Sequence, residues 1–92
     1  MKVLIINEEK KVFEGSADFL EAPGVAGEIG IMPAHAKMLA PLKSGQIIIK
    51  NADAEPLSFD INGGFLKVDS DKIDILTSSL SERKNNEVNW LW

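Results

Sequence analysis

Cysteine is absent from the 92 residues of this chain, and histidine occurs once, as His35. Without cysteine the chain cannot form disulfides, thiolate zinc sites or a thiol nucleophile. A lone imidazole is more often a hydrogen-bonded structural residue than a metal ligand or a base. The sequence therefore nearly excludes these routes to metal chemistry and catalysis, and we expect no cofactor and no metal.

An excess of basic residues is missing as well. The chain carries 10 Lys and Arg against 14 Asp and Glu, for a formal charge of −4, and its lysines are scattered along the sequence. Proteins that bind nucleic acid without sequence preference need clustered Lys and Arg to displace counterions. We therefore expect no nucleic-acid partner.

Long hydrophobic runs are also missing. The longest apolar stretch near the start is Val3 to Ile6, whereas a membrane-spanning helix needs roughly 20 apolar residues and a signal-peptide core about 7–15. We expect a cytoplasmic protein unless a partner holds it at a membrane. A chain of 92 residues suits one small domain of modest stability, to which a partner surface can contribute.

What the sequence contains instead is a series of short apolar groups rich in Ile, Val and Phe, which Gly, Pro, Asn or Asp separate about every ten residues. This pattern predicts an all-β fold. The clearest strand is Leu57 to Ile61, where strict alternation puts the apolar side chains on one face. Asn62-Gly63-Gly64 then predicts a hairpin or a glycine bulge, and Asp69 to Lys72 predicts a second turn, so that the chain forms an antiparallel meander.

The first half of the chain repeats the theme. We predict strands over 2–7 and 17–22, with a turn near Glu8 to Lys10 after the first and Pro23-Gly24 ending the second. Gly27 and Gly30 flank Glu28-Ile29, which predicts a tight edge strand or a loop where two backbones approach closely.

Two further segments lie in the middle of the chain. Residues 34–40 stand between two prolines and are too few for a stable helix, so we predict an extended connection with at most one helical turn. Gln46-Ile47-Ile48-Ile49-Lys50 predicts a strand, and its unbroken apolar run predicts burial on both faces.

The composition changes after Leu80, where residues 81–92 are mostly polar until Trp90, Leu91 and Trp92. We therefore predict one β domain over 1–80 and a polar C-terminal tail over 81–92. The spacing of Ser79 and Glu82 fits a capping box, so a short or frayed helix is an alternative for the start of the tail.

Motifs that bind ions or phosphate are incomplete. Asp69, Asp71 and Asp74 resemble the start of a calcium loop, but Asp74 stands where a glycine is needed and Leu80 where a glutamate is needed. The glycine-rich segment 24–30 lacks the strand, helix and lysine of a phosphate loop. We predict a structural turn for the first and a β-connection for the second.

Carboxylates and aromatic residues are the remaining candidates. Glu8 with Glu9, or Glu21 with Glu28, could supply an acid and a base, but nothing in the sequence suggests a buried pair, and we predict solvated side chains and no catalytic residues. Phe19, Trp90 and Trp92 could form a contact surface, since aromatic residues are enriched at interface centres. Ordinary packing is the equal alternative for these three.

A family resemblance is carried by the glycine-containing segments. They are Gly27-Glu28-Ile29-Gly30-Ile31-Met32-Pro33-Ala34-His35-Ala36, then Leu39, Leu42-Lys43-Ser44-Gly45, and Asn62-Gly63-Gly64-Phe65-Leu66-Lys67-Val68. Together they resemble the epsilon subunit of F-type ATP synthases, called delta in mitochondria. The resemblance covers Val3 to about Leu80 with almost no change in length. Ala34 departs from it, because the family commonly has glycine or asparagine there.

The resemblance implies a fold that the strand pattern alone could not count: a flattened antiparallel β-sandwich of about ten short strands. It also implies a non-catalytic subunit of the central stalk, which clamps the foot of the gamma subunit to the polar loops of the membrane c-ring during proton-driven ATP synthesis. The chain would lie at the cytoplasmic side of the bacterial inner membrane, held there through the c-ring only, and the isolated chain is compatible with a monomer.

The resemblance also implies contact residues. The segment of Glu28, Ile29, Gly30, Ile31 and Met32 would lie near the c-ring, where the Glu28 carboxylate can meet a basic or polar loop, and His35 would lie by gamma or the ring. Most bacterial and chloroplast members continue into a two-helix domain that can inhibit ATP hydrolysis. Only the tail follows the sandwich here, so we expect coupling without such inhibition. The alternative is a free-standing β-sandwich module that binds a carbohydrate or a peptide.

Overall fold

Eight β-strands and no helix make up the described part of the chain, in a computed structural model that describes residues 1–8, 10–34, 36–78 and 80–84. The all-β prediction is confirmed. The strands are β1 (Lys2–Asn7), β2 (Lys10–Ser16), β3 (Phe19–Gly24), β4 (Gly27–Ile31), β5 (Met38–Asn51), β6 (Ala54–Asp69), β7 (Lys72–Thr77) and β8 (Leu80–Lys84).

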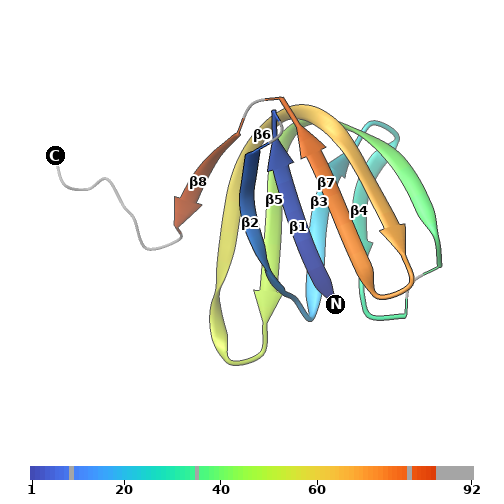
Figure 1. The fold of residues 1–92 in the computed structure, drawn as a ribbon, viewed down its shortest axis with the longest axis vertical. Coiled ribbons are helices and arrows are strands. Elements are labelled where there is room, and N and C mark those ends of the chain that lie inside the picture. Colours follow the sequence, from blue (N-terminus) through green and yellow to red (C-terminus); the bar gives the residue numbers. More distant parts are fainter. Residues whose placement is uncertain (9, 35, 79, 85–92) are drawn as a thin grey trace, which may run out of the picture.

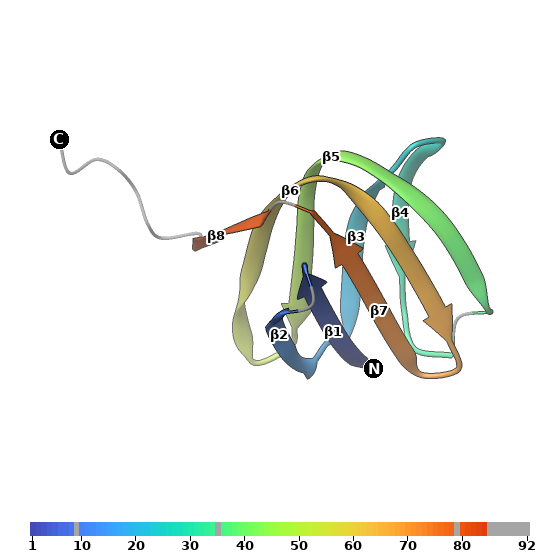
Figure 2. The same cartoon turned by 45° about the horizontal axis from the view of Figure 1, so that its top comes forward.

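The strands form two layers joined by two long strands (Figures 1 and 2). Hydrogen bonding follows the order β2-β1-β7-β6-β5-β3-β4, and β8 pairs with β6 outside this path. In Figure 1, β5 and β6 arch over the top of the molecule, so one half of each strand belongs to each layer. The predicted count of about ten was too high, because β5 and β6 run through both layers as single strands of 14 and 16 residues.

One pair of strands departs from the predicted antiparallel arrangement. β1 lies parallel to β7, with Val3 opposite Ile73 and Ile5 opposite Ile75. The remaining pairs, including the β1–β2 hairpin and the β6–β7 hairpin, are antiparallel. The sheet is therefore mixed, and its parallel pair joins the first strand to one from the end of the domain.

The glycine pair in β6 makes a bend and no hairpin. Gly63 and Gly64 have φ angles of 89° and 147°, which side chains rarely allow. A Cβ atom on Gly64 would lie 2.1 Å from the carbonyl oxygen of Leu76, and the Thr77 hydroxyl donates a 2.7 Å hydrogen bond to the Gly63 carbonyl. β6 therefore pairs with β8 before the bend and with β7 after it. Of the two predicted reversals, only the turn between Asp69 and Lys72 is a hairpin.

The core lies between the two layers and is entirely aliphatic apart from Phe59. Its buried members are Val3, Ile5, Ala17, Leu20, Ala22, Ile31, Leu42, Ile47, Ile49, Phe59, Ile61, Leu66, Val68, Ile73 and Ile75. The predicted inward face of the strand around Phe59 is confirmed. The prediction for the isoleucine run was wrong in part, because Ile47 and Ile49 are buried but Ile48, on the opposite face, is only half-buried.

The predictions around β4 are correct in part: the edge strand is present, but β3 runs through the predicted end at Pro23-Gly24, and β5 begins inside the predicted connection over 34–40. β3 includes Pro23 and ends at Gly24, and β4 follows as an edge strand that pairs only with β3 among the described strands. After β4 the chain continues without a helix in its described residues until β5 begins at Met38. Ala34, in this connection, has a left-handed φ of 67°.

The start of the predicted tail is a strand instead of a helix. Leu80 pairs with Ile61 and Lys84 with Leu57, so β8 extends the layer that contains the first half of β6. Pairing with the edge of an existing strand gives hydrogen-bond partners to backbone N–H and C=O groups. A short helix built from residues of low helix propensity would be only marginally stable. Trp90 and Trp92 lie outside the described residues.

Replacement of Phe59 tests the core. Phe59 is 2% exposed, and its ring centroid lies 5.5 Å from that of Phe13. We expect Phe59→Ala to lower the free energy of unfolding by about 3–5 kcal/mol, as large aromatic truncations in packed cores do. The matched control is Phe65→Ala, because Phe65 is 54% exposed. Urea midpoints that fall equally for both variants would contradict this packing.

Replacement of Ala34 tests the backbone strain. A left-handed conformation costs an alanine about 1–2 kcal/mol, whereas glycine adopts it freely at a smaller entropic cost. We expect Ala34→Gly to raise the free energy of unfolding by about 0.5–1 kcal/mol. Ala26→Gly is the control, since the φ of Ala26 is not positive and glycine there should destabilise. Destabilisation by both changes in thermal unfolding would show that Ala34 is unstrained.

Candidate functional site

Among the residues whose burial the structure describes, large apolar side chains are exposed at five positions: Val25, Met32, Leu39, Phe65 and Leu76. Their exposed fractions run from 52% for Leu76 to 71% for Leu39. Scattered exposed apolar residues are ordinary, but adjacent ones mark surfaces that bind a partner.

Three of these side chains lie together on the outer side of one layer. Across the sheet, Pro41 of β5 is opposite Phe65 of β6, Phe65 is opposite Leu76 of β7, and Leu76 is opposite Ile6 of β1. Leu39 stands two residues from Pro41 on the same face of β5. Cross-strand neighbours on one face have Cβ atoms about 4.5–5.5 Å apart. We call Ile6, Leu39, Pro41, Phe65 and Leu76 the apolar face.

The sequence analysis did not predict the apolar face, although the alternation of residues in β7 is visible in the sequence. Ile73 and Ile75 alternate toward the core, so their neighbours Asp74 and Leu76 must point outward. An outward leucine is unremarkable alone. The surface becomes visible only when strand register places Phe65 beside it.

A row of charged side chains borders the apolar face. Cross-strand pairing puts Lys67 of β6, Asp74 of β7 and Glu14 of β2 in one row, which the apolar Leu4 of β1 interrupts between Asp74 and Glu14. The Lys11 ammonium donates a 2.7 Å hydrogen bond to Glu14, and this bond, with the charges of Lys11, Lys2 and Lys72, holds the pKa of Glu14 below its ordinary value. An apolar centre with a charged rim is the usual anatomy of a protein interface.

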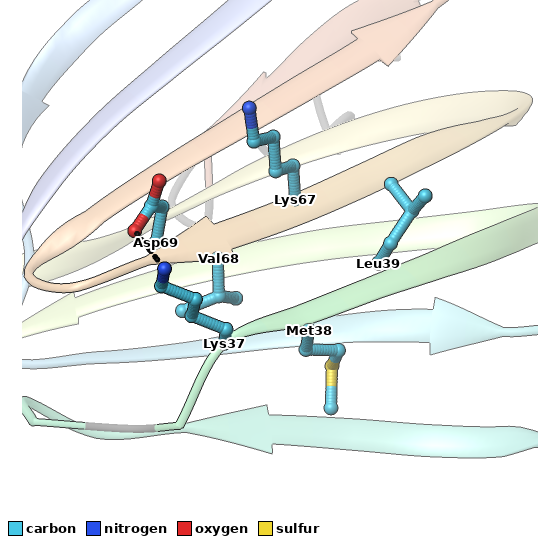
Figure 3. Close-up of a pocket in the computed structure, with 6 residues that line it drawn as sticks. All are labelled: Lys37, Met38, Leu39, Lys67, Val68 and Asp69. Atoms are coloured by element: carbon cyan, nitrogen blue, oxygen red, sulfur yellow. Dashed lines mark ion pairs between the residues drawn. The ribbon is translucent and has the colours of Figure 1, made fainter.

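A hollow of about 460 Å³ lies at one end of the apolar face (Figure 3). Three apolar residues, Met38, Leu39 and Val68, and three charged ones, Lys37, Lys67 and Asp69, line it. Figure 3 shows Leu39 and Lys67 on one side of the sheet and Met38 on the other. Lys37 and Asp69 form an ion pair of 3.9 Å at its edge, so the hollow extends the apolar face toward the polar β6–β7 turn.

The predicted contact segment lies on edge strand β4 and just beyond it. Glu28 is exposed, Ile29 packs partly against the core and Gly30 is exposed. Met32 follows the strand and is 62% exposed. Ile31 is fully buried because it pairs with Leu20 on the inward side, so its side chain is unavailable to a partner. His35 lies outside the described residues.

Phe19 packs within the sandwich surface. Its side chain is half-buried, and a Cβ atom on Gly30 would lie 3.1 Å from its ring. The Lys50 ammonium lies 5.5 Å from the ring centroid and 3.6 Å from Glu21. These contacts account for Phe19 by ordinary packing, the second of the two interpretations given above.

A second hollow, of about 350 Å³, joins β4 to the apolar face. It is lined by Gly24, Val25, Ala26, Gly27, Glu28, Ile29, Ala40 and Pro41. The Val25 amide donates a 3.0 Å hydrogen bond to the Pro41 carbonyl. Pro41 therefore belongs both to this hollow and to the apolar face.

Acidic side chains are dispersed over the described part of the structure. No group of three or more acidic or histidine side chains among the described residues could hold a metal ion. Of the carboxylates predicted to be solvated, Glu8 and Glu28 are exposed, Glu21 is half-buried, and Glu9 lies outside the described residues. The described part of the chain contains no helix that is long and apolar enough to span a membrane.

The described strands form a small β-sandwich with large apolar side chains exposed on its surface. Residues 1–83 match the family described as ATP synthase, Delta/Epsilon chain, beta-sandwich domain. The chain belongs to this family.

Curated relatives agree with this assignment. The chain is 40% identical over 85 residues to ATP synthase epsilon chain 1 of Methylococcus capsulatus, covering 92% of this chain and 61% of that protein. It is 37% identical over 79 residues to the ATP synthase epsilon chain of Micrococcus luteus, covering 86% and 87%. It thus spans less than two thirds of the first relative but most of the second.

Solved structures share the fold at low sequence identity. One match is a chain in the structure of the Euglena gracilis mitochondrial ATP synthase, which comprises OSCP, F1 and the c-ring. The two chains superpose with a TM-score of 0.81 at 17% identity, and the match covers 87% of this chain and 51% of the other. A chain of the Tetrahymena thermophila mitochondrial ATP synthase structure of central stalk and c-ring gives 0.71 at 18% identity, covering 99% and 72%.

Proposed function

We propose that this chain is a non-catalytic subunit of the central stalk of an F-type ATP synthase, coupling rotation of the membrane c-ring to the gamma subunit during proton-driven ATP synthesis. Family membership supports this function. The observation that carries it is the apolar face, which consists of exposed apolar side chains on β5, β6 and β7 and half-buried Ile6 on β1. The alternative of a free-standing carbohydrate or peptide module is not favoured by the family match.

Transmission of torque needs a body that does not shear. The two layers of a sandwich could slide if only side chains joined them, but β5 and β6 belong to both layers and pair from Met38–Val68 to Asn51–Ala54. Relative sliding would break this ladder as well as the close packing of the core. Force applied at one surface therefore reaches the other with little deformation.

The gamma subunit is the proposed partner of the apolar face. Phe65, Leu76 and Leu39 supply large apolar area at its centre, while Lys67, Asp74 and Glu14 supply the polar border. Burial of such a centre provides affinity, and the charged border fixes orientation. The open hollow beside Leu39 would receive a side chain of the partner.

The c-ring is the proposed partner of the segment around Glu28 and Met32. Glu28 has an exposed carboxylate that makes no ion pair with any described residue, and Met32, four residues further along the chain, offers an exposed apolar side chain. A polar or basic ring loop can meet both. Ile29 and Ile31 support the strand from the core side, and His35 stays a predicted contact. The chain would lie at the cytoplasmic side of the bacterial inner membrane.

Replacement of Phe65 tests the gamma assignment. A carboxylate at the centre of a desolvated apolar contact is costly, so we expect Phe65→Asp to weaken binding to purified gamma subunit about a hundredfold, which equals about 2.7 kcal/mol. The fold should survive, because Phe65 is 54% exposed.

The control for this test is Ala54→Asp. It adds the same charge at an exposed position at the start of β6, far along the strand from the apolar face. Titration calorimetry measures both variants. Equal affinity of Phe65→Asp and the unmodified chain for gamma would contradict the assignment.

A further inference from the structure

Three strands of the sandwich, β2, β4 and β8, pair on one side only among the described strands. Unpaired edges invite pairing with another chain, and proteins usually protect them with lysine, proline, bulges or other charges. β2 begins with Lys10-Lys11 and faces a bulge between Ile5 and Ile6. The sequence of β8 contains Glu82-Arg83-Lys84. Both of these edges therefore carry protection.

The edge of β4 carries little protection. The sequence Gly27-Glu28-Ile29-Gly30-Ile31 has no lysine and no proline and only one charge. All five residues pair with β3 in unbroken register, without a bulge. A regular edge strand with small and β-branched residues is a good template for another strand.

The register also identifies the free backbone groups of β4. A two-residue turn, Val25-Ala26, joins Gly24 to Gly27, and the pair that closes such a turn is hydrogen bonded. Hydrogen-bonded and non-hydrogen-bonded pairs then alternate, so Glu28 and Gly30 fall in non-hydrogen-bonded pairs. Pro23, which has no N–H to donate, stands opposite Glu28. The N–H and C=O groups of Glu28 and Gly30 therefore point away from β3.

A hollow connects the surroundings of β4 with the apolar face. The hollow of about 350 Å³ runs beside Gly27, Glu28 and Ile29. Ala40 and Pro41 of β5 line the same hollow, and Pro41 belongs to the apolar face. A partner seated on the apolar face can therefore continue directly onto the edge of β4.

We propose that β4 receives an extended segment of the gamma subunit as an additional strand, with main-chain hydrogen bonds to Glu28 and Gly30. This inference rests on the proposed function and specifies how gamma is held. Side chains stand perpendicular to a sheet while N–H and C=O groups lie in its plane. The Glu28 carboxylate can thus face the c-ring while its backbone pairs with gamma.

A proline substitution separates the backbone of Glu28 from its side chain. Glu28→Pro removes an outward N–H and puts a ring in the path of an added strand, yet an outward edge position tolerates proline. We expect it to weaken gamma binding about tenfold or more, and Glu28→Gln, which keeps the N–H, to weaken it by no more than about threefold. Equal losses for the two variants would overturn the inference. Urea unfolding of each variant verifies that it folds.

Amide hydrogen exchange gives a second measurement that needs no substitution. The unmodified chain is exchanged alone and in complex with gamma, then quenched and analysed by NMR. We expect the amides of Glu28 and Gly30 to exchange rapidly in the chain alone and at least about a hundredfold more slowly in the complex. The Ile29 and Ile31 amides, which bond to β3, should be protected in both states.

The outcomes separate this inference from the function on which it rests. If gamma binds, Phe65→Asp weakens binding and the Glu28 and Gly30 amides stay unprotected, strand addition is wrong and the proposed function stands. If gamma does not bind the unmodified chain, both are wrong. Protection that rises with the concentration of the chain alone would show that a second copy occupies β4, which also overturns the inference.

Discussion

The pairing of β5 with β6 is the interaction on which the rest of the structure depends. It runs from Met38 opposite Val68 to Asn51 opposite Ala54 and passes through both layers. The bend at Gly63-Gly64 lets one strand serve both layers, because β6 pairs with β8 on one side of it and β7 on the other. Without this ladder the two halves would be separate small sheets, and the inner apolar face of each would be exposed to solvent.

The same arrangement separates the two proposed contact surfaces. The apolar face covers the outer side of the layer formed by β1, β7 and the adjoining halves of β6 and β5. β4 is the last strand of the hydrogen-bonding path, reached through β3 from the second half of β5. Between them lies the hollow that is lined both by Pro41 of the apolar face and by Glu28 of β4. A single rigid body can thus hold one partner along a face and an edge and present a loop to another.

Local patterns in the sequence were sufficient for much of the fold. The alternation around Phe59 gave its inward face, and the polar turn between Asp69 and Lys72 gave a hairpin. The segment Asn62-Gly63-Gly64 was ambiguous, since a bend and a hairpin need the same permissive residues and differ only in which distant strand pairs next. The half-burial of Ile48 was missed for a related reason. An apolar run does not reveal that one of its faces lies on the outside of the sandwich.

Less of the candidate site could be predicted from the sequence. The family resemblance pointed to the segment from Glu28 to Met32, but it did not separate exposed Glu28 and Met32 from buried Ile31, which depends on the register with β3. The apolar face brings together residues from four strands distributed from Ile6 to Leu76. Only the order of strands in the sheet makes them neighbours, and the parallel β1–β7 pair was not predictable from local periodicity.

The central claim is that one rigid sandwich holds gamma and the c-ring on different surfaces. Site-specific photo-crosslinking in the assembled membrane enzyme tests it most directly, with the photoreactive residue placed at Leu76 in one preparation and at Met32 in another. Both positions are more than half exposed, so neither label should disturb the core. The account predicts an adduct with gamma from Leu76 and an adduct with the c subunit from Met32. Adducts with the same subunit from both positions, or with neither partner from Leu76, would contradict it.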